Sequence, residues 1–185
     1  MAYKKVSIPK NGDGAACPIP KDPNIIVIDV DDIVKEPSRA VGDPKMVGDY
    51  ELKEGAKAIA IYGTPNSISF TEEYSGDPDA RGCKLGVAFS HPGDSDDIRG
   101  CVEAFMNKGV IILTKVCDGS ATGKMNATGS KCNPLFLSVE TTNNNESIKR
   151  TLTFKQELNS SFLHGTYAGA IPDIADPAAD VAEGA

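Results

Sequence analysis

The chain has 185 residues, 40% of them hydrophobic, and a formal net charge of −7. This length fits one domain with a core of its own. An acidic surface repels nucleic acid and anionic membranes, which argues against DNA binding by electrostatic attraction. No apolar run approaches the length of a membrane span. Residues 1–12 lack the apolar stretch of a signal peptide, so we expect synthesis in the cytoplasm.

The first part of the chain predicts short strands joined by turns and loops. Residues 1–23 contain Pro, Gly and Lys without periodicity, and we interpret them as an arm or an edge segment. The apolar run at 24–34 predicts a strand. Gly, Pro and charged residues at 35–55 predict a long loop with room for a short hairpin. Two more strands are predicted at 56–63 and 67–75, separated by a Pro-containing turn.

A single segment, residues 95–108, has helical periodicity. Asp94 or Ser95 is suited to cap its first turn, and Gly109 is predicted to end it in the left-handed conformation. Its apolar side chains share one face, which predicts packing against a sheet. These residues are Ile98, Cys101, Val102, Phe105 and Met106.

The other strands are separated by a turn at 76–82 and an Asn-rich turn at 143–147. The latter is predicted to join a β-hairpin. These strands cover residues 83–90, 109–119, 133–142, 148–156 and 160–169.

Many strands and one helix predict a mainly β (α+β) fold, namely a twisted antiparallel β-sandwich or barrel subunit with one flanking helix, long loops and extended termini. We assign 1–23 to an N-terminal arm, 24–169 to the β domain and 170–185 to an acidic C-terminal arm. The last segment has four acidic and no basic residues, a composition that cannot fold alone. A neighbouring subunit is the simplest element to hold it in place.

The five cysteines are odd in number, far apart in the sequence and never in a Cys-x-x-Cys pair, so neither a zinc site nor a disulfide is predicted. We interpret them as buried free thiols. They are Cys17, Cys83, Cys101, Cys117 and Cys132.

Two segments look like phosphate-handling motifs. The strand that runs into Asp29-x-Asp31, with Asp32 next and an acidic loop at 93–97, is similar to the nucleophile motif of haloacid dehalogenase phosphatases. That fold needs repeated strand–helix units, which are missing here. The segment Gly119–Lys124 has three residues between its glycines where a phosphate loop has four, so we interpret it as a turn.

The remaining candidates are two histidines and an acidic turn. His91 and His164 could each pair with a cysteine or serine, but no spacing predicts it, so a structural role is expected. Four acidic residues are interpreted as solvated turn residues: Glu72, Glu73, Asp77 and Asp79. We therefore assign no catalytic, cofactor-binding or metal-binding residue and expect a protein that is not an enzyme.

The order of features across residues 65–156 resembles a known family. A strand in Thr-Pro-Asn-Ser-Ile-Ser-Phe-Thr-Glu-Glu is followed by Gly-Asp-x-Asp, a strand to His91-Pro92-Gly93, the helix and a buried strand. The turn Gly-Ser-Lys-Cys-Asn-Pro-Leu at 129–135 then precedes the hairpin. This order is similar to that of the tail tube (major tail) proteins of long-tailed bacteriophages and related injection tubes.

The resemblance implies a β-sandwich subunit that forms rings, commonly hexameric, whose sheets join edge to edge. Stacked rings make a hollow conduit through which viral DNA passes without specific binding, and an acidic lumen keeps DNA from adhering. The expected partners are further copies of the chain and other tail proteins, with no membrane, and the expected location is the virion. The alternatives are a tail terminator, a baseplate ring, a capsid decoration protein or a haloacid dehalogenase-like phosphatase.

Overall fold

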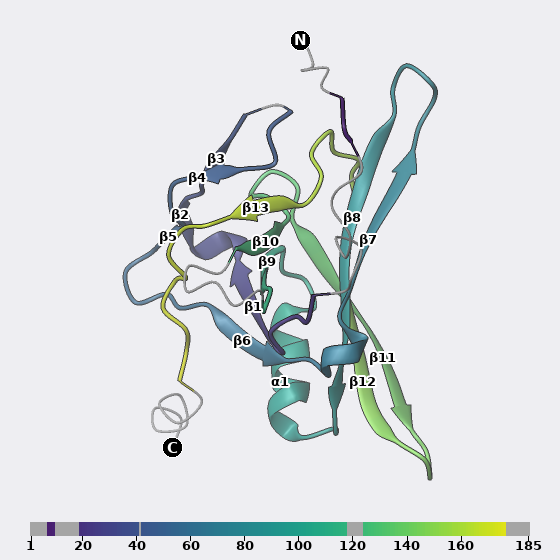
Figure 1. Cartoon of the computed structure of the whole chain (residues 1–185). Helices are drawn as coiled ribbons and strands as arrows, with labels where there is room; N and C mark the ends of the chain where they lie inside the picture. The colour runs from purple at the N-terminus through teal and green to yellow at the C-terminus, as the bar shows by residue number, and fades with distance from the viewer. Residues whose placement is uncertain (1–6, 10–18, 41, 118–123, 177–185) are drawn as a thin grey trace.

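The computed structural model describes residues 7–9, 19–40, 42–117 and 124–176. It is mainly β, with antiparallel strands in a sandwich-like arrangement and one α-helix at its side (Figure 1). The predicted fold class is therefore confirmed, except that the described strands do not close into a barrel.

The first layer, sheet A, has the strand order β6-β1-β9-β10-β13, with every pair antiparallel. Its central strands consist of apolar residues in unbroken runs, a pattern that fits burial on both faces. Residues 25–28 and 110–113 are all at most 4% exposed. The strands are β1 (Asn24–Asp29), β6 (Ile59–Tyr62), β9 (Val110–Lys115), β10 (Met125–Thr128) and β13 (Gly165–Tyr167).

The second layer, sheet B, has the order β7-β8-β12-β11 and is also antiparallel. Apolar and polar residues alternate along β12, so only one of its faces is buried. The layers join at one pair, Leu135 of β11 with Val110 of β9. The strands are β7 (Ser69–Ser75), β8 (Gly82–Pro92), β11 (Leu135–Asn143) and β12 (Ile148–Gln156).

The helix α1 (Asp96–Phe105) packs its apolar face onto the core between the two sheets. Ile98 and Phe105 are buried there, as predicted. Three details of the prediction were wrong. The helix is shorter than 95–108, Met106 is 60% exposed, and Gly109 does not have a positive φ. Gly109 is instead required for space, because an added Cβ would lie 2.8 Å from Pro134 Cβ and 2.9 Å from Val30 Cγ2.

A second core lies on the opposite face of sheet A. The region 30–58 covers it with two small hairpin-like pairs, β2 with β5 and β3 with β4. The predicted strand at 24–34 was wrong in its second half. Asp29 accepts a hydrogen bond from the Asp31 amide and starts a short 3₁₀ turn there. The bounds are η1 (Val30–Asp32), β2 (Ile33–Lys35), β3 (Ser38–Arg39), β4 (Met46–Val47), β5 (Glu51–Leu52) and η2 (Pro65–Ser67).

Both ends of the described chain attach to sheet A. Lys21 forms a bridge with Val116, which supports the edge-segment interpretation for that part of residues 1–23. Residues 170–176 cross the second core and form a parallel bridge between Ile174 and Ala58. Contacts within the same chain therefore hold this part of the acidic segment, and a neighbouring subunit is not needed for it. Residues 177–185 lie outside the described residues.

Candidate functional site

The aspartates of the phosphatase-like motif are occupied by structural contacts. Asp29 Oδ1 accepts from the Asp31 amide at 2.9 Å, and Asp29 Oδ2 pairs with the Lys108 ammonium group. A carboxylate held by an amide and an ammonium group is stabilised as an anion but has little freedom to attack a substrate. The phosphate-loop-like segment lies outside the described residues apart from Lys124.

The two histidines are separate and take structural hydrogen bonds. His91 Nδ1 donates to the Tyr62 carbonyl at 2.8 Å, and His164 Nδ1 lies 2.8 Å from Thr128 Oγ1. Burial lowers the pKa of His164, which favours its neutral form. No contact joins either ring to a cysteine or serine among the described residues, so the structure brings no nucleophile–base pair together at these positions.

The acidic turn after β7 is divided among other partners. Glu72 accepts from the Tyr74 hydroxyl, and Glu73 pairs with Lys155 at 2.6 Å. Within the described part of the chain, no cluster of three His, Cys, Asp or Glu side chains could hold a metal ion. Nor does any described helix have the length and hydrophobicity to cross a bilayer. Cys83 is buried and Cys101 is half-buried. Cys117 and Cys132 are exposed, so the buried-thiol interpretation is wrong for these two, and Cys17 lies outside the described residues.

The most extended candidate for a functional feature is the pair of edges of sheet B that, beyond Leu135, have no neighbouring strand among the described residues. β7 pairs only with β8 among the described strands, and β11 has a second strand partner only at Leu135. The Asn144 amide donates to the Ser147 carbonyl, so these two residues form a hydrogen-bonded pair. Hydrogen-bonded and non-hydrogen-bonded pairs alternate along an antiparallel ladder, and the residues of a non-hydrogen-bonded pair direct their backbone groups away from each other. Backbone groups that point away from the sheet therefore belong to Leu137, Val139, Thr141 and Asn143 on β11, and to Phe70, Glu72 and Tyr74 on β7.

No other described element forms a layer over the outer face of sheet B (Figure 1). The registers place small hydroxyl residues such as Ser138, Thr151 and Thr153 on this face, with charges of both signs among them. The charged residues are Glu73, Lys84, Glu140, Lys149 and Lys155. Apart from Phe136, which pairs with Lys155 and lies on the same side, this face is hydrophilic without being acidic.

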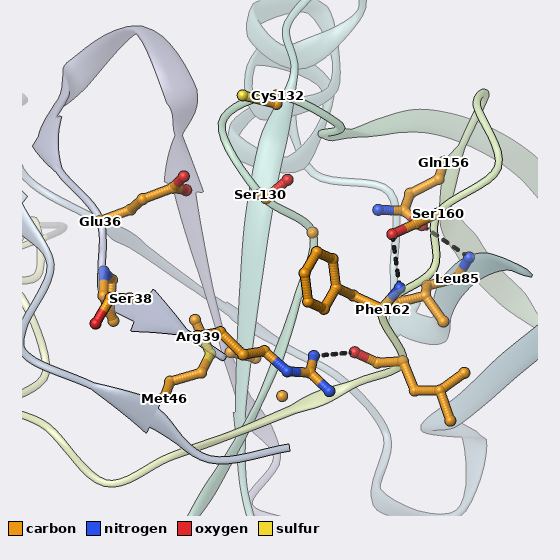
Figure 2. A pocket seen from close by; sticks show the side chains of 15 residues that line it. Glu36, Ser38, Arg39, Met46, Leu85, Ser130, Cys132, Gln156, Ser160 and Phe162 are labelled. Carbon is orange, nitrogen blue, oxygen red and sulfur yellow. Dashed lines mark hydrogen bonds between the residues drawn. The ribbon is translucent and has the colours of Figure 1, made fainter. Parts of the chain in front are cut away.

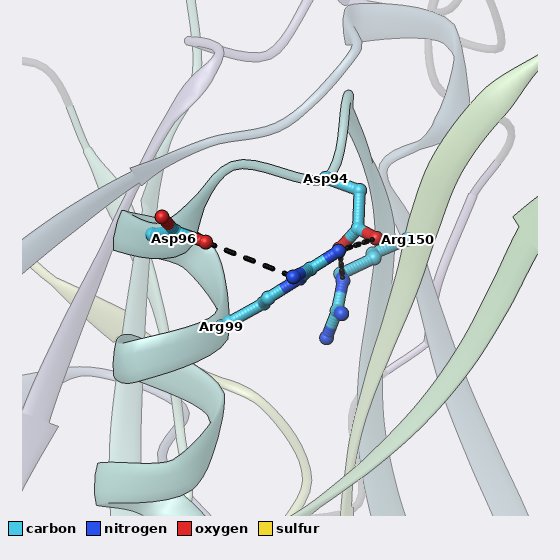
Figure 3. Close-up of polar contacts among 4 residues, drawn as sticks. All are labelled: Asp94, Asp96, Arg99 and Arg150. Atoms are coloured by element: carbon cyan, nitrogen blue, oxygen red, sulfur yellow. Dashed lines mark hydrogen bonds and ion pairs between the residues drawn. The ribbon is translucent and has the colours of Figure 1, made fainter.

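An ion-pair network fixes α1 to sheet B (Figure 3). Asp94 was a predicted cap, but its carboxylate instead binds Arg99 on the helix and Arg150 on β12. Ser95 is the N-cap residue without a side-chain hydrogen bond. The Arg99 and Arg150 guanidinium groups lower the pKa of Asp94 to about 2. The ion-pair network therefore fixes the start of the helix to sheet B.

A cavity of about 350 Å³ opens between the β3–β4 pair and the segment 157–165 (Figure 2). We call it the Arg39 groove. Its polar groups are bonded to the protein. For example, Gln156 accepts from the Leu85 amide and donates to the Asn133 carbonyl. The apolar walls are Pro37, Met46, Leu85, Ala127, Phe162 and Leu163.

Sequence reasoning missed both the groove and β10, which forms part of its wall. Met125 and Ala127 of β10 are buried while Asn126 is not, so a strand alternation is present but only four residues long. The groove joins residues 36–46 to residues 127–165, and no local pattern predicts that contact.

Comparison with known proteins identifies no relative: no family model matches the chain, and neither does any curated protein or solved structure.

Proposed function

We propose that this chain is a non-enzymatic structural subunit that assembles into rings, and that these are the hexameric tail tube rings that the family resemblance implies. Stacked rings form the conduit through which phage DNA passes, and the location is the virion. The observation that carries the proposal is the pair of free edges on sheet B. A sheet edge with unpaired backbone groups is a template for pairing with another chain.

The strand order supports a closed ring. β7 and β11 are the two outer strands of a fully antiparallel four-stranded sheet, so they run in opposite directions. When copies are related by rotation, β7 of one copy meets β11 of the next in antiparallel orientation. A heterologous contact of this kind closes into a ring if the rotation permits. The outward backbone groups of Phe70, Glu72 and Tyr74 on β7 then gain partners among the four outward residues of β11.

The outer face of sheet B fits a water-filled bore. Hydroxyl and charged residues of both signs stay hydrated, and they offer DNA no continuous basic stripe to bind. The expected acidic lumen does not extend to this face, so repulsion of DNA comes from the overall charge of −7.

Sedimentation velocity and electron microscopy of the full-length protein test the proposal. Rings that stack into open-ended tubes support it. Single rings that do not stack favour a tail terminator or baseplate ring, and a protein that stays monomeric at high concentration contradicts it. Tubes should not bind free duplex DNA at physiological salt.

A further inference from the structure

The Arg39 groove contains a cation whose hydrogen bonds go to neutral oxygens, with the Asp43 carboxylate nearby but not in contact as an ion pair. Arg39 Nε donates to the Asp43 carbonyl at 2.8 Å and Nη1 donates to the Leu163 carbonyl, so both partners are neutral oxygens. The guanidinium carbon lies 5.3 Å from the centre of the Phe162 ring (Figure 2). No carboxylate forms an ion pair with Arg39 among the described residues.

The surroundings of Arg39 make an anion favourable there. Burial lowers the pKa of Arg39 and outweighs the raising effect of the Asp43 carboxylate, so the charge has lost part of its water. A guanidinium group that is partly removed from water gains more from a carboxylate than an exposed one does. Phe162 and Leu163 are still 37% and 41% exposed, so apolar surface remains available beside the charge. The groove therefore fits a segment that is both acidic and apolar.

The sequence after Asp176 has this composition. Residues 177–185 read PAADVAEGA, with two acidic residues, no basic residue and one branched apolar side chain, Val181. In an extended segment, residues two apart face the same side. Val181 and Glu183 can thus enter one groove together, with Val181 on Phe162 and Leu163 and the Glu183 carboxylate on Arg39.

The described chain ends at Asp176, near the edge of sheet A opposite the groove. Gly165, at the β13 edge of sheet A, lines the groove, whereas Ile174 pairs with Ala58 just before β6 at the opposite edge. Four strand spacings separate these edges, about 19 Å. The nine residues after Asp176 span at most about 30 Å, so they reach the groove of the same chain only if the chain reverses direction along sheet A. A second copy placed head to tail needs no such reversal.

We propose that residues 177–185 of one copy bind in the Arg39 groove of another copy and so link neighbouring subunits. This inference rests on the proposed self-assembly. It adds a second contact between subunits, separate from the pairing of the sheet B edges.

A cross-linking experiment tests it, because the exposed thiol of Cys132 lies at the groove. A donor chain carries Val181→Cys with Cys132→Ser, and the acceptor is the wild-type chain. The two are mixed, assembled and mildly oxidised, and the linked peptides are identified by mass spectrometry. We expect a donor–acceptor dimer joined between Cys132 and position 181. A link within one chain in the single variant Val181→Cys, or no link in either sample, overturns the inference.

Charge reversal provides an independent measurement. Arg39→Glu and Glu183→Arg should each raise the protein concentration needed for assembly about tenfold or more, and the double variant should recover much of the loss. Lys53→Glu, an equal charge change at an exposed loop, should leave assembly unchanged. Tubes that form normally in both single variants overturn the inference and leave the tube proposal intact. A wild-type protein that never assembles overturns both.

Discussion

Strands β9 and β12 lie in adjoining layers and show two ways of building a sheet. β9 is buried on both faces, between the core shared with sheet B and the second core under residues 30–58. β12 is buried on one face only, with Leu152 and Phe154 inward and Thr151 and Thr153 outward. The difference lies in exposure, because β9 has no face open to solvent, whereas sheet B keeps one polar face and two unpaired edges among the described residues.

The largest expected contrast lies between neighbouring residues of β12. Phe154 is fully buried and its ring centre lies 6.0 Å from that of Phe89. Phe154→Ala should lower the free energy of unfolding by about 3–5 kcal/mol, since it removes a buried aromatic ring. Thr153→Ala, on the outer face, should change it by less than about 0.5 kcal/mol. Chemical denaturation measures both, and equal losses would show that the outer face is also a packed core.

The same comparison along β9 should show no contrast. Ile111 faces the second core and Ile112 faces the core between the sheets, and both are fully buried. Ile111→Ala and Ile112→Ala should each cost about 2–5 kcal/mol of unfolding free energy. A loss below about 1 kcal/mol for Ile111→Ala alone would mean that residues 30–58 and 168–176 do not form a stable layer.

The stabilisation that the Asp94 ion-pair network provides should be lost in acid. The pKa of Asp94 is about 2 in the folded protein against an ordinary value of 3.8. Its contribution to stability is therefore fully present above pH 3.8 and is lost as the pH falls toward 2. The difference in unfolding free energy between the wild type and Asp94→Asn should shrink over this range. Asp96→Asn, at a fully exposed side chain, serves as the control. A difference that is constant with pH would contradict the network.

Burial of His164 gives a smaller effect at milder pH. Its pKa in the folded protein lies below the ordinary value of 6.5. The neutral ring is favoured, so stability should be full above pH 6.5 and decrease as the pH falls below it. His164→Gln should weaken this dependence in thermal unfolding measured from pH 7.5 to 5. An unchanged pH profile would show that the ring is solvated in solution.

The sequence predicted what local pattern controls. The apolar run at 109–119 predicted a buried strand, and the Asn-rich turn predicted the hairpin of the strands on either side of it. It failed where a distant contact decides the conformation. Gly109 is constrained by Pro134 and Val30 rather than by a helix cap, and Asp94 turns to Arg150 of β12 instead of the first helical turn. The Arg39 groove is likewise formed by segments more than 80 residues apart.

The most direct test of the assembly account uses the free edge of β11. The Thr141 amide points away from β12 toward the free edge, whereas the Thr142 amide points toward β12. Proline removes that donor, and sheets tolerate it at an edge that faces solvent. Thr141→Pro should therefore leave a folded subunit that fails to form rings, while Thr142→Pro should lower the free energy of unfolding by about 3 kcal/mol.

Sedimentation velocity of Thr141→Pro beside the wild type measures the outcome. The account predicts rings or tubes for the wild type and a folded monomer for the variant. Assembly of Thr141→Pro at the wild-type concentration would contradict the claim that the β11 edge joins the subunits.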